Sequence, residues 1–224
     1  MSLQIGWLLV LILPMVLGLW AQRKVKSTFT KYEAVRPMSG LTGAQAAQAV
    51  IDSSGLQGVT INLIGGRLSD HYNPRSKTLN LSEPVGAASS ISALGVAAHE
   101  AGHAIQHAQG YHFMKLRQTL VPVARIGSSL WIFAVMGGFL LGIAGLVTVG
   151  LVLFSAIVLF QLVTLPVEFD ASNRALAALE NHGMLVGQEV GQAKDVLDAA
   201  AWTYVAAFVA SLAQLIYFFL LSRR

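Results

Sequence analysis

The stretch "IGSSLWIFAVMGGFLLGIAGLVTVGLVLFSAIVLFQLVTLPV" (residues 126–167) holds 42 residues and no charged side chain. One α-helix of this length would be about 63 Å long, whereas the hydrocarbon core of a bilayer is about 30 Å thick. A single crossing cannot use so many apolar residues. We therefore predict two membrane-spanning helices, at about residues 126–145 and 147–165, joined by a turn near Gly142–Gly145.

Two further apolar runs extend this pattern toward both ends of the chain. Residues 3–20 carry no charge and are followed by "QRKVK", and residues 199–221 carry none and are followed by "SRR". Each run is long enough to cross a bilayer. Hydrophobic residues make up 54% of the sequence and charged residues only 12%, about half the charged share of a typical soluble protein. We predict an integral membrane protein with about four transmembrane helices.

Basic residues beside the spans set the expected orientation. Arg23, Lys24 and Lys26 follow the first span, so the positive-inside rule places the N-terminus outside and the next segment in the cytoplasm. Arg223 and Arg224 then fall on the opposite side, against the same bias. The net charge of +4 includes no basic stripe of the kind that binds nucleic acid. The absence of cysteine excludes disulfides, thiolate ligands and cysteine nucleophiles.

Polar residues concentrate at about residues 21–118 and 168–198, which we predict to be an extramembrane body. Caps, alternation and turn residues predict its elements. These are a helix at 41–55, strands at 58–66 and 78–82, a helix from Ser89 or Ser90 to Gly110, and a polar-faced helix at 168–183. The predicted fold is thus mainly α, with a small α+β body, in one membrane-embedded domain of residues 1–224.

The centre of the fourth of these elements carries the sequence "HEAGH", from His99 to His103. Residues i and i+4 share one helix face, so both imidazoles can bind one ion, and Glu100 can reach a water on that ion. Two neutral imidazoles suit Zn²⁺, which needs a third protein ligand and one open position in a catalytic site. We predict one Zn²⁺ per chain, with Glu100 as general base. Polar residues on an ordinary helix surface would give no reason for this spacing.

The third ligand has to come from elsewhere in the chain. His107 is eight residues from His99, about 800° and 12 Å along a helix, so we predict that it is not a ligand. Two predicted spans separate the HExxH helix from Glu168, so the chain returns to the side of the membrane on which that helix lies. This favours Glu168, which directly follows the second of these spans, as the third ligand. The other candidates in the later chain are Asp170, Glu180, Glu189, Asp195, Asp198 and His182. Asp170 lies about 200° round the helix from Glu168, so both are not expected to bind one ion.

Four stretches of the sequence, in the same order along the chain, resemble a known protein family, and the resemblance extends over nearly the whole chain. They are "LSDHYNPRSKTLNLS", "AAHEAGHAIQH", "LPVEFDASNRALAAL" and "VLDAAAWTYVAA". With them the chain resembles the YugP-type neutral zinc metallopeptidases of bacterial membranes. It is more distantly similar to HtpX-type membrane peptidases, in which a strand precedes the HExxH helix and the glutamate of an E-x-x-A-D motif is the third ligand.

This resemblance implies a zincin-like body in which Glu168 completes the zinc site. Ser172 stands where the motif has its aspartate, so the carboxylate that would orient a ligating imidazole is missing. Asp170 or Asp70 could take that role. The likeness also implies that the strand at 78–82 is an edge strand that pairs with the substrate, although it could equally be a plain structural strand. His71 and Tyr72 could stabilise an oxyanion, or could simply anchor the loop.

The leading hypothesis is a multi-pass zinc endopeptidase of the bacterial inner or plasma membrane that cuts membrane or membrane-adjacent polypeptides. Its site is expected at the cytoplasmic boundary of the bilayer. One alternative is a site-2-type intramembrane protease completed by Asp198, which the serines around the motif helix oppose. Another is a non-catalytic, zinc-stabilised membrane scaffold, which would have no use for Glu100. No pattern identifies substrate-binding side chains or an oligomeric state.

Overall fold

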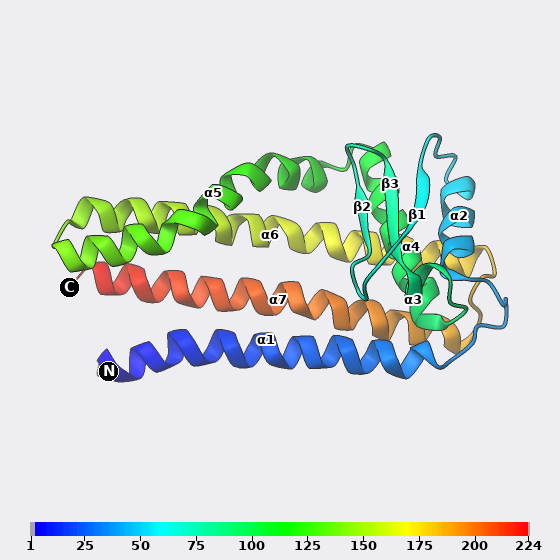
Figure 1. Cartoon of the computed structure of the whole chain (residues 1–224), viewed down its shortest axis with the longest axis horizontal. Helices are drawn as coiled ribbons and strands as arrows, with labels where there is room; N and C mark the ends of the chain where they lie inside the picture. Colours follow the sequence, from blue (N-terminus) through cyan, green and yellow to red (C-terminus); the bar gives the residue numbers. More distant parts are fainter. Residues whose placement is uncertain (1–2, 224) are drawn as a thin grey trace. The chain divides into compact units, whose positions relative to one another are not determined.

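The computed structural model describes the backbone of residues 3–223 and the side chains of residues 12–223. This part of the chain contains seven helices and three strands, and Figure 1 shows how they follow one another. They are α1 (Leu3–Glu33), α2 (Gly43–Ser53), β1 (Thr60–Ile64), β2 (His71–Asn73), β3 (Thr78–Ser82), α3 (Glu83–Gly86), α4 (Ile91–Ala108), α5 (His112–Leu141), α6 (Ala144–Asn181) and α7 (Gln188–Ser222).

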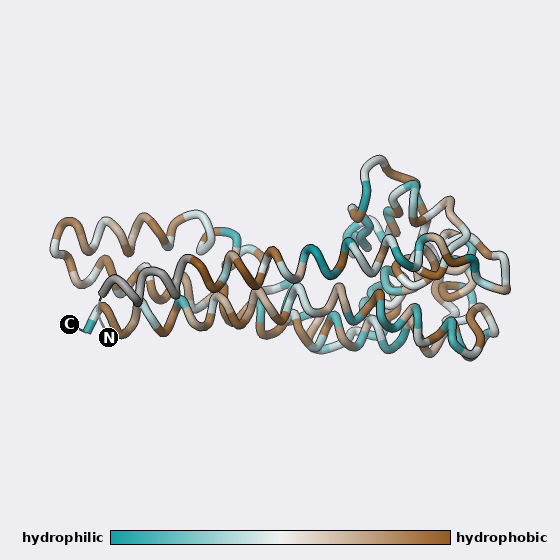
Figure 2. The backbone as a smooth tube through the Cα atoms, turned by 90° about the horizontal axis from the view of Figure 1, so that it is seen from below, coloured by the Kyte–Doolittle hydropathy of each residue, from teal (hydrophilic) through white to brown (hydrophobic). Residues whose placement is uncertain are grey.

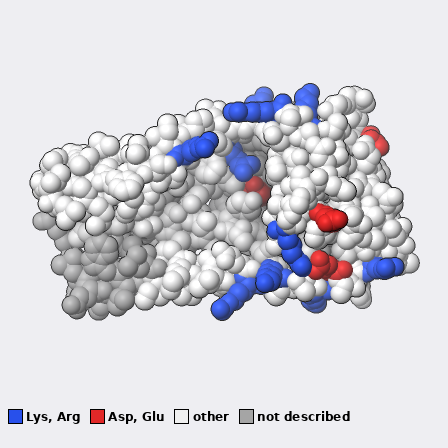
Figure 3. All heavy atoms as spheres, in the orientation of Figure 1, with Lys and Arg blue, Asp and Glu red and all other residues white. Residues whose placement is uncertain are grey.

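The chain divides into two compact units. One, here the apolar unit, comprises the chain up to Gln22, Lys115–Pro166 and the residues from Trp202 onward. The other, here the polar unit, comprises Arg23–Met114 and Val167–Ala201. All 11 Asp and Glu residues belong to the polar unit, and the charged residues of the apolar unit are basic. Figure 3 shows the charged side chains on one face of the molecule. The single domain predicted for residues 1–224 stays a prediction.

Three helices, α5, α6 and α7, are long and apolar enough to cross a membrane. Helices α6 and α7 contain the spans predicted at 147–165 and 199–221, and α5 contains the span predicted at 126–145 up to Leu141, four residues short of its predicted end. Figure 2 shows the hydrophobic residues along these helices. The turn predicted near Gly142 is present, because α5 ends at Leu141 and Gly142 has a φ of 68°, which favours glycine. The first predicted span, 3–20, is helical within α1, but its side chains up to residue 11 lie outside the described part, so it stays a prediction.

Glycines let α5 and α6 approach each other within the apolar unit. A Cβ added at Gly127 would lie 2.8 Å from the Leu153 carbonyl oxygen, and one at Gly150 would lie 2.8 Å from the Val135 nitrogen. Small residues at such interfaces are typical of membrane helices, where close backbone packing replaces the hydrophobic driving force. Phe133 is 73% exposed on the outside of the same pair, as expected for a side chain that faces lipid.

The polar unit contains a three-stranded sheet in the order β1-β3-β2. Strand β3 pairs in parallel with β1 and antiparallel with β2. The prediction that residues 78–82 form an edge strand is therefore wrong, because both sides of β3 are occupied. The edges are β1 and β2. Strand β2 was not predicted, since three residues are too few to show the alternation of a strand.

Helix α4 is the central element of the polar unit and follows its predicted bounds. Its N-cap is Ser90, whose side chain accepts a hydrogen bond from the Ala93 N–H. The buried core includes Leu94, Ala97 and Ala101 of this helix, together with Val50 of α2 and Leu179 of α6. Because so many of its residues are small, other helices pack closely on several sides of α4.

The helix predicted at 168–183 is not a separate element. Helix α6 runs without a break from Ala144 to Asn181, with Pro166 inside it. A proline removes one backbone hydrogen bond and usually kinks or ends a helix, but here the helix continues. Glu168 therefore projects from the interior of a long helix rather than from the first turn of a short one.

Close packing of α4 on α6 depends on Gly102. A Cβ at Gly102 would lie 2.6 Å from the carbonyl oxygen of Ala171, three residues after Glu168, whereas a Cβ at Gly95 would make ordinary contacts of 3.7–3.9 Å with Ala193. We expect Gly102→Ala to lower the free energy of unfolding by about 1–3 kcal/mol through overpacking. Gly95→Ala, the matched control, should be neutral or stabilising by up to about 1 kcal/mol. Thermal unfolding in detergent, followed by circular dichroism, measures both, and equal melting temperatures would contradict this role of Gly102.

Candidate metal centre

The two histidines of the HExxH sequence lie side by side on one face of α4. Their ring centroids are 4.7 Å apart, with an angle of 80° between the ring planes. His103 is 8% exposed, and His99 is partly buried. This is the arrangement expected for residues i and i+4 of a helix, and both Nε2 atoms face the same neighbour on α6.

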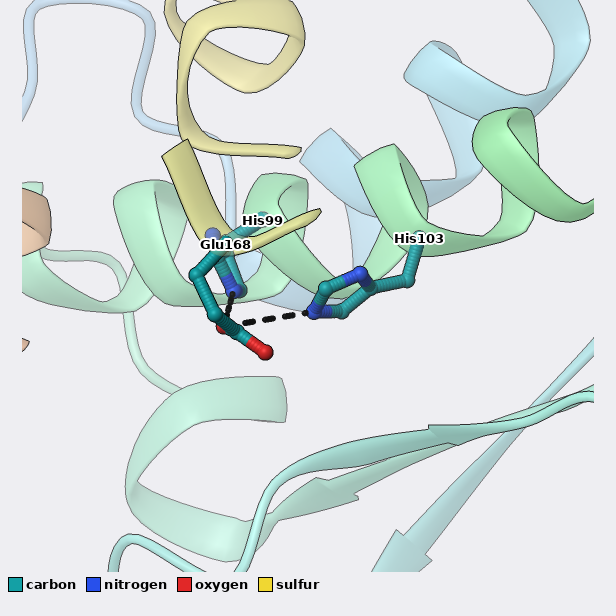
Figure 4. A group of neighbouring side chains, drawn as sticks. All are labelled: His99, His103 and Glu168. Carbon is teal, nitrogen blue, oxygen red and sulfur yellow. Dashed lines mark ion pairs between the residues drawn. The ribbon is translucent and has the colours of Figure 1, made fainter. Parts of the chain in front are cut away.

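That neighbour is Glu168, which is 3% exposed. Its Oε2 atom lies 3.3 Å from Nε2 of His99 and 3.6 Å from Nε2 of His103, and Figure 4 shows the carboxylate between the two rings. One ligand atom from each residue lies within 4.8 Å of the others, and in the described part of the chain this is the group that could hold a metal ion. Two imidazole nitrogens and one carboxylate oxygen fit a catalytic Zn²⁺ site, which keeps its fourth position open.

Hydrogen bonds to the other ring nitrogens orient both imidazoles. Nδ1 of His99 lies 3.1 Å from the hydroxyl oxygen of Ser172, and Nδ1 of His103 lies 3.0 Å from Oε1 of Gln106. Such partners hold a ligating ring in place and decide which nitrogen carries the proton. Ser172 therefore occupies, with a hydroxyl, the place in which the related motif has an aspartate.

The contacts of Gln106 decide the tautomer of His103. The Gln106 amide nitrogen donates to the Val167 carbonyl at 2.8 Å and to the Asp170 carboxylate at 2.7 Å. Both of these groups can only accept, so the amide oxygen has to be the atom that faces His103. An amide oxygen accepts a hydrogen bond, which requires the proton of His103 to be on Nδ1. The lone pair on Nε2 is then directed toward Glu168 and is available to a metal ion.

Asp170 contributes to the site through this amide and not as a ligand. Besides Gln106, its carboxylate accepts a hydrogen bond from the guanidinium of Arg174. Asp70, the other substitute considered for the missing aspartate, accepts hydrogen bonds from the backbone and side chain of Ser82. Of the two, only Asp170 is connected to a histidine of the HExxH sequence, and Gln106 is the link that sequence analysis missed. The signal was the position of Gln106 one turn after His103, on the same helix face.

Charge and burial act on His103 in opposite directions. Burial alone lowers the pKa of its imidazole, but the hydrogen bond and negative charge of Glu168, together with the charge of Glu100, raise it, and the net pKa lies above the usual value. A metal ion and the second proton compete for Nε2. The two carboxylates that favour the proton would also favour a cation at the same place.

Glu100 lies close to the group formed by His99, His103 and Glu168, here called the ligand group, but does not belong to it. Its side chain is 8% exposed, and its Oε2 atom accepts a hydrogen bond of 2.8 Å from the backbone N–H of Tyr72, in the middle of β2. The carboxylate is therefore held by the strand next to α4. This position suits a general base, which has to lie near the metal ion without binding it.

The other candidate residues have different partners. Asp195 accepts a hydrogen bond from the Tyr32 hydroxyl, Asp198 from Lys194, and Glu189 from the backbone N–H groups of Met38 and Val186. Glu180 and His182 are exposed near the end of α6. None of these residues belongs to the group around His99 in the structure described for residues 12–223.

Neither His71 nor the Tyr72 side chain points to the ligand group. Nδ1 of His71 donates to the Ser69 carbonyl, and its Nε2 lies 3.2 Å from the amide nitrogen of Asn80 on β3. The Tyr72 hydroxyl lies 2.9 Å from Nδ1 of His107. His71 thus contacts the segment before β2 and the neighbouring strand β3, and Tyr72 contacts α4 through both its backbone and its ring.

Comparison with known proteins assigns the chain to a family. The model of the family described as "Putative neutral zinc metallopeptidase" matches residues 7–223. The chain is 46% identical over 202 residues to the protein named "Putative membrane protease YugP" of Bacillus subtilis (strain 168), which covers 90% of each chain. No solved structure matches. The chain belongs to this family of zinc metallopeptidases, which confirms the resemblance seen in the sequence. Zinc is the metal that the site of His99, His103 and Glu168 could hold.

Proposed function

We propose that this member of the neutral zinc metallopeptidase family is a membrane-bound endopeptidase, with His99, His103 and Glu168 as zinc ligands and Glu100 as general base. One observation carries the proposal. The Glu168 carboxylate converges on both Nε2 atoms, at 3.3 and 3.6 Å, while a second buried carboxylate, Glu100, lies on the same helix as the histidines but outside the ligand group. A site with three protein ligands and a carboxylate nearby is the composition of a hydrolytic zinc centre.

Each residue then has a defined task. Zn²⁺ held by His99, His103 and Glu168 would polarise the scissile carbonyl and acidify a water. Glu100 would accept a proton from a water at the site and deliver it to the leaving amine. Tyr72 holds the Glu100 carboxylate through its N–H, at 2.8 Å. Ser172 and Gln106 keep the two imidazoles in the orientation in which Nε2 faces the ion.

We further propose a multi-pass protein of the bacterial inner or plasma membrane, with the polar unit in the cytoplasm. The three apolar helices support the membrane location, and Arg23, Lys24 and Lys26 support the orientation. The Bacillus subtilis relative is itself named a membrane protease. The expected substrate is accordingly a polypeptide in the membrane or next to it.

The two alternative functions have less support. A structural zinc site would use four protein ligands and close the coordination shell, whereas the group found among the described residues offers three. In a site-2-type protease Asp198 would complete the site, but the partner of Asp198 is Lys194, one turn earlier on α7. The scaffold alternative also assigns no role to Glu100.

The proposal is tested on the full-length protein purified in detergent. We expect about one zinc ion per chain by mass spectrometry and slow cleavage of fluorescein-labelled casein and of a mixture of labelled peptides. Removal of zinc with phenanthroline should abolish cleavage, and one equivalent of Zn²⁺ should restore it. Cleavage that continues in the metal-free protein would contradict a zinc mechanism.

A further inference from the structure

His107 follows the HExxH sequence by one turn and has no place in the ligand group. We propose that His107 is a positioning residue, which holds Tyr72 so that the Tyr72 backbone N–H keeps the Glu100 carboxylate in place. The inference deepens the proposed function and rests on the role of Glu100 as general base. Tyr72 contacts both α4 residues, Glu100 and His107.

Tyr72 contacts α4 at two points. Its backbone N–H donates to Oε2 of Glu100 at 2.8 Å, and its hydroxyl oxygen lies 2.9 Å from Nδ1 of His107. The rings of Tyr72 and His107 also pack on each other, with centroids 5.8 Å apart. Burial raises the pKa of the Tyr72 phenol, so the hydroxyl keeps its proton and this hydrogen bond at neutral pH.

Helix geometry explains why these two residues of α4 share one partner. Glu100 and His107 are seven residues apart, which is nearly two full turns and about 10 Å of rise, so they lie on the same stripe of the helix. A tyrosine that lies along this stripe can bond with its backbone at one end and with its hydroxyl at the other. Around the helix, His107 thus lies about 80° from His99 but only about 20° from Glu100.

The strand that carries Tyr72 needs such an anchor. Strand β2 has only three residues, and in the sheet it pairs with β3 alone. Short two-stranded pairings are marginally stable in water. Because alternate residues of an antiparallel pair direct their N–H groups to opposite sides, the N–H of Tyr72 can serve Glu100 instead of β3. The bond to His107 then fixes how far β2 lies from α4, and with it the Glu100 contact.

The ligands of the metal have separate supports. Ser172 orients His99 and Gln106 orients His103, and neither residue contacts Tyr72 in the hydrogen bonds described. Loss of His107 should therefore weaken the positioning of Glu100 while zinc stays bound. The expected signature is a lower kcat with unchanged KM and unchanged zinc content.

The experiment is a double-mutant cycle on the full-length protein in detergent. His107→Ala, Tyr72→Phe and the double variant are compared for zinc content and for kcat and KM on a fluorogenic peptide selected from the labelled mixture. We expect each single variant to lower kcat about tenfold, the effect of one lost hydrogen bond, and the double variant to be no worse than either single one. His107→Gln, whose amide can bond to the phenol, should recover most of the activity. His112→Ala and Tyr111→Phe, at the start of α5 and just before it, are the matched controls and should behave like wild type.

The outcomes separate this inference from the proposed function. If Glu100→Gln cleaves the peptide as fast as wild type, the proposed function is wrong and the positioning role falls with it. If Glu100→Gln is inactive but His107→Ala has wild-type kcat, only the positioning role is overturned. It is also overturned if the two single losses multiply in the double variant, if zinc is lost with His107, or if His107→Gln is as impaired as His107→Ala.

Discussion

Glu100→Gln should retain about one zinc ion per chain and lose cleavage by a factor of about 10²–10⁴, the usual contribution of a general base. Glutamine has nearly the same size as glutamate, and its amide oxygen can still accept the hydrogen bond that Tyr72 donates to Glu100. What it cannot do is take a proton from water. Since Glu100 is not in the group of His99, His103 and Glu168, loss of its charge should weaken zinc binding far less than loss of a ligand would.

Zinc content and kcat, measured on the same preparation, test this expectation. Glu83→Gln serves as the matched control, because Glu83 is an exposed glutamate at the start of α3 and its loss should leave both quantities unchanged. Wild-type cleavage by Glu100→Gln would remove Glu100 from the reaction. Loss of zinc from the same variant would instead place Glu100 among the ligands, and the open coordination position would be closed.

The features of this protein that could be predicted from the sequence are those set by local patterns. The absence of charge between residues 126 and 167 limits the possible structures to membrane-length helices, and α5 and α6 follow that prediction, including the turn at Gly142. The serine cap and the end of α4 also depend on neighbouring residues alone. The motif within α4 needs only helical periodicity to bring His99 and His103 together.

Other features depend on contacts between distant segments and could not be predicted in the same way. Strand β3 lies in the centre of the sheet because it pairs with β1 on one side and β2 on the other. The sequence of residues 78–82 alone does not indicate this position. The continuation of α6 past Pro166 runs against the local rule for proline. There the close contact of Gly102 with Ala171 holds α6 against α4 soon after the proline.

In the candidate site, too, some features follow from local sequence patterns and others only from contacts between distant segments. Residue types and spacing identified two histidines and a glutamate on α4, while seven residues of the later chain remained possible as the third ligand. The even number of predicted membrane crossings between the HExxH helix and Glu168, together with the family resemblance, favoured Glu168. In the structure, packing of α6 on α4 brings Glu168 to the two histidines. The sequence shows only that Gln106 shares a helix face with His103. The contact of Gln106 with the half-buried Asp170 carboxylate and that of the Tyr72 N–H with Glu100 exist only in the folded chain.

Glu168→Ala should abolish stable zinc binding. Two imidazoles on one helix make a weak, open pair of ligands, and the third ligand supplies both the missing bond and the negative charge that offsets Zn²⁺. Glu180→Ala is the matched control, since Glu180 lies on the same helix and is exposed. Because a ligand that binds only the folded state stabilises it, by about 2.7 kcal/mol at a hundred times its Kd, added Zn²⁺ should raise the melting temperature of wild type and Glu180→Ala but not of Glu168→Ala.

This measurement needs no substrate, so it tests the ligand set apart from catalysis. Zinc that binds to Glu168→Ala with wild-type affinity would show that another carboxylate completes the site. Asp170 would then be the first residue to replace, because it is the next carboxylate on α6 and already contacts Gln106. The structure argues against that result. Asp170 is engaged by Arg174 as well as by Gln106, and it would have to break both bonds and turn about 200° around the helix to reach the two Nε2 atoms.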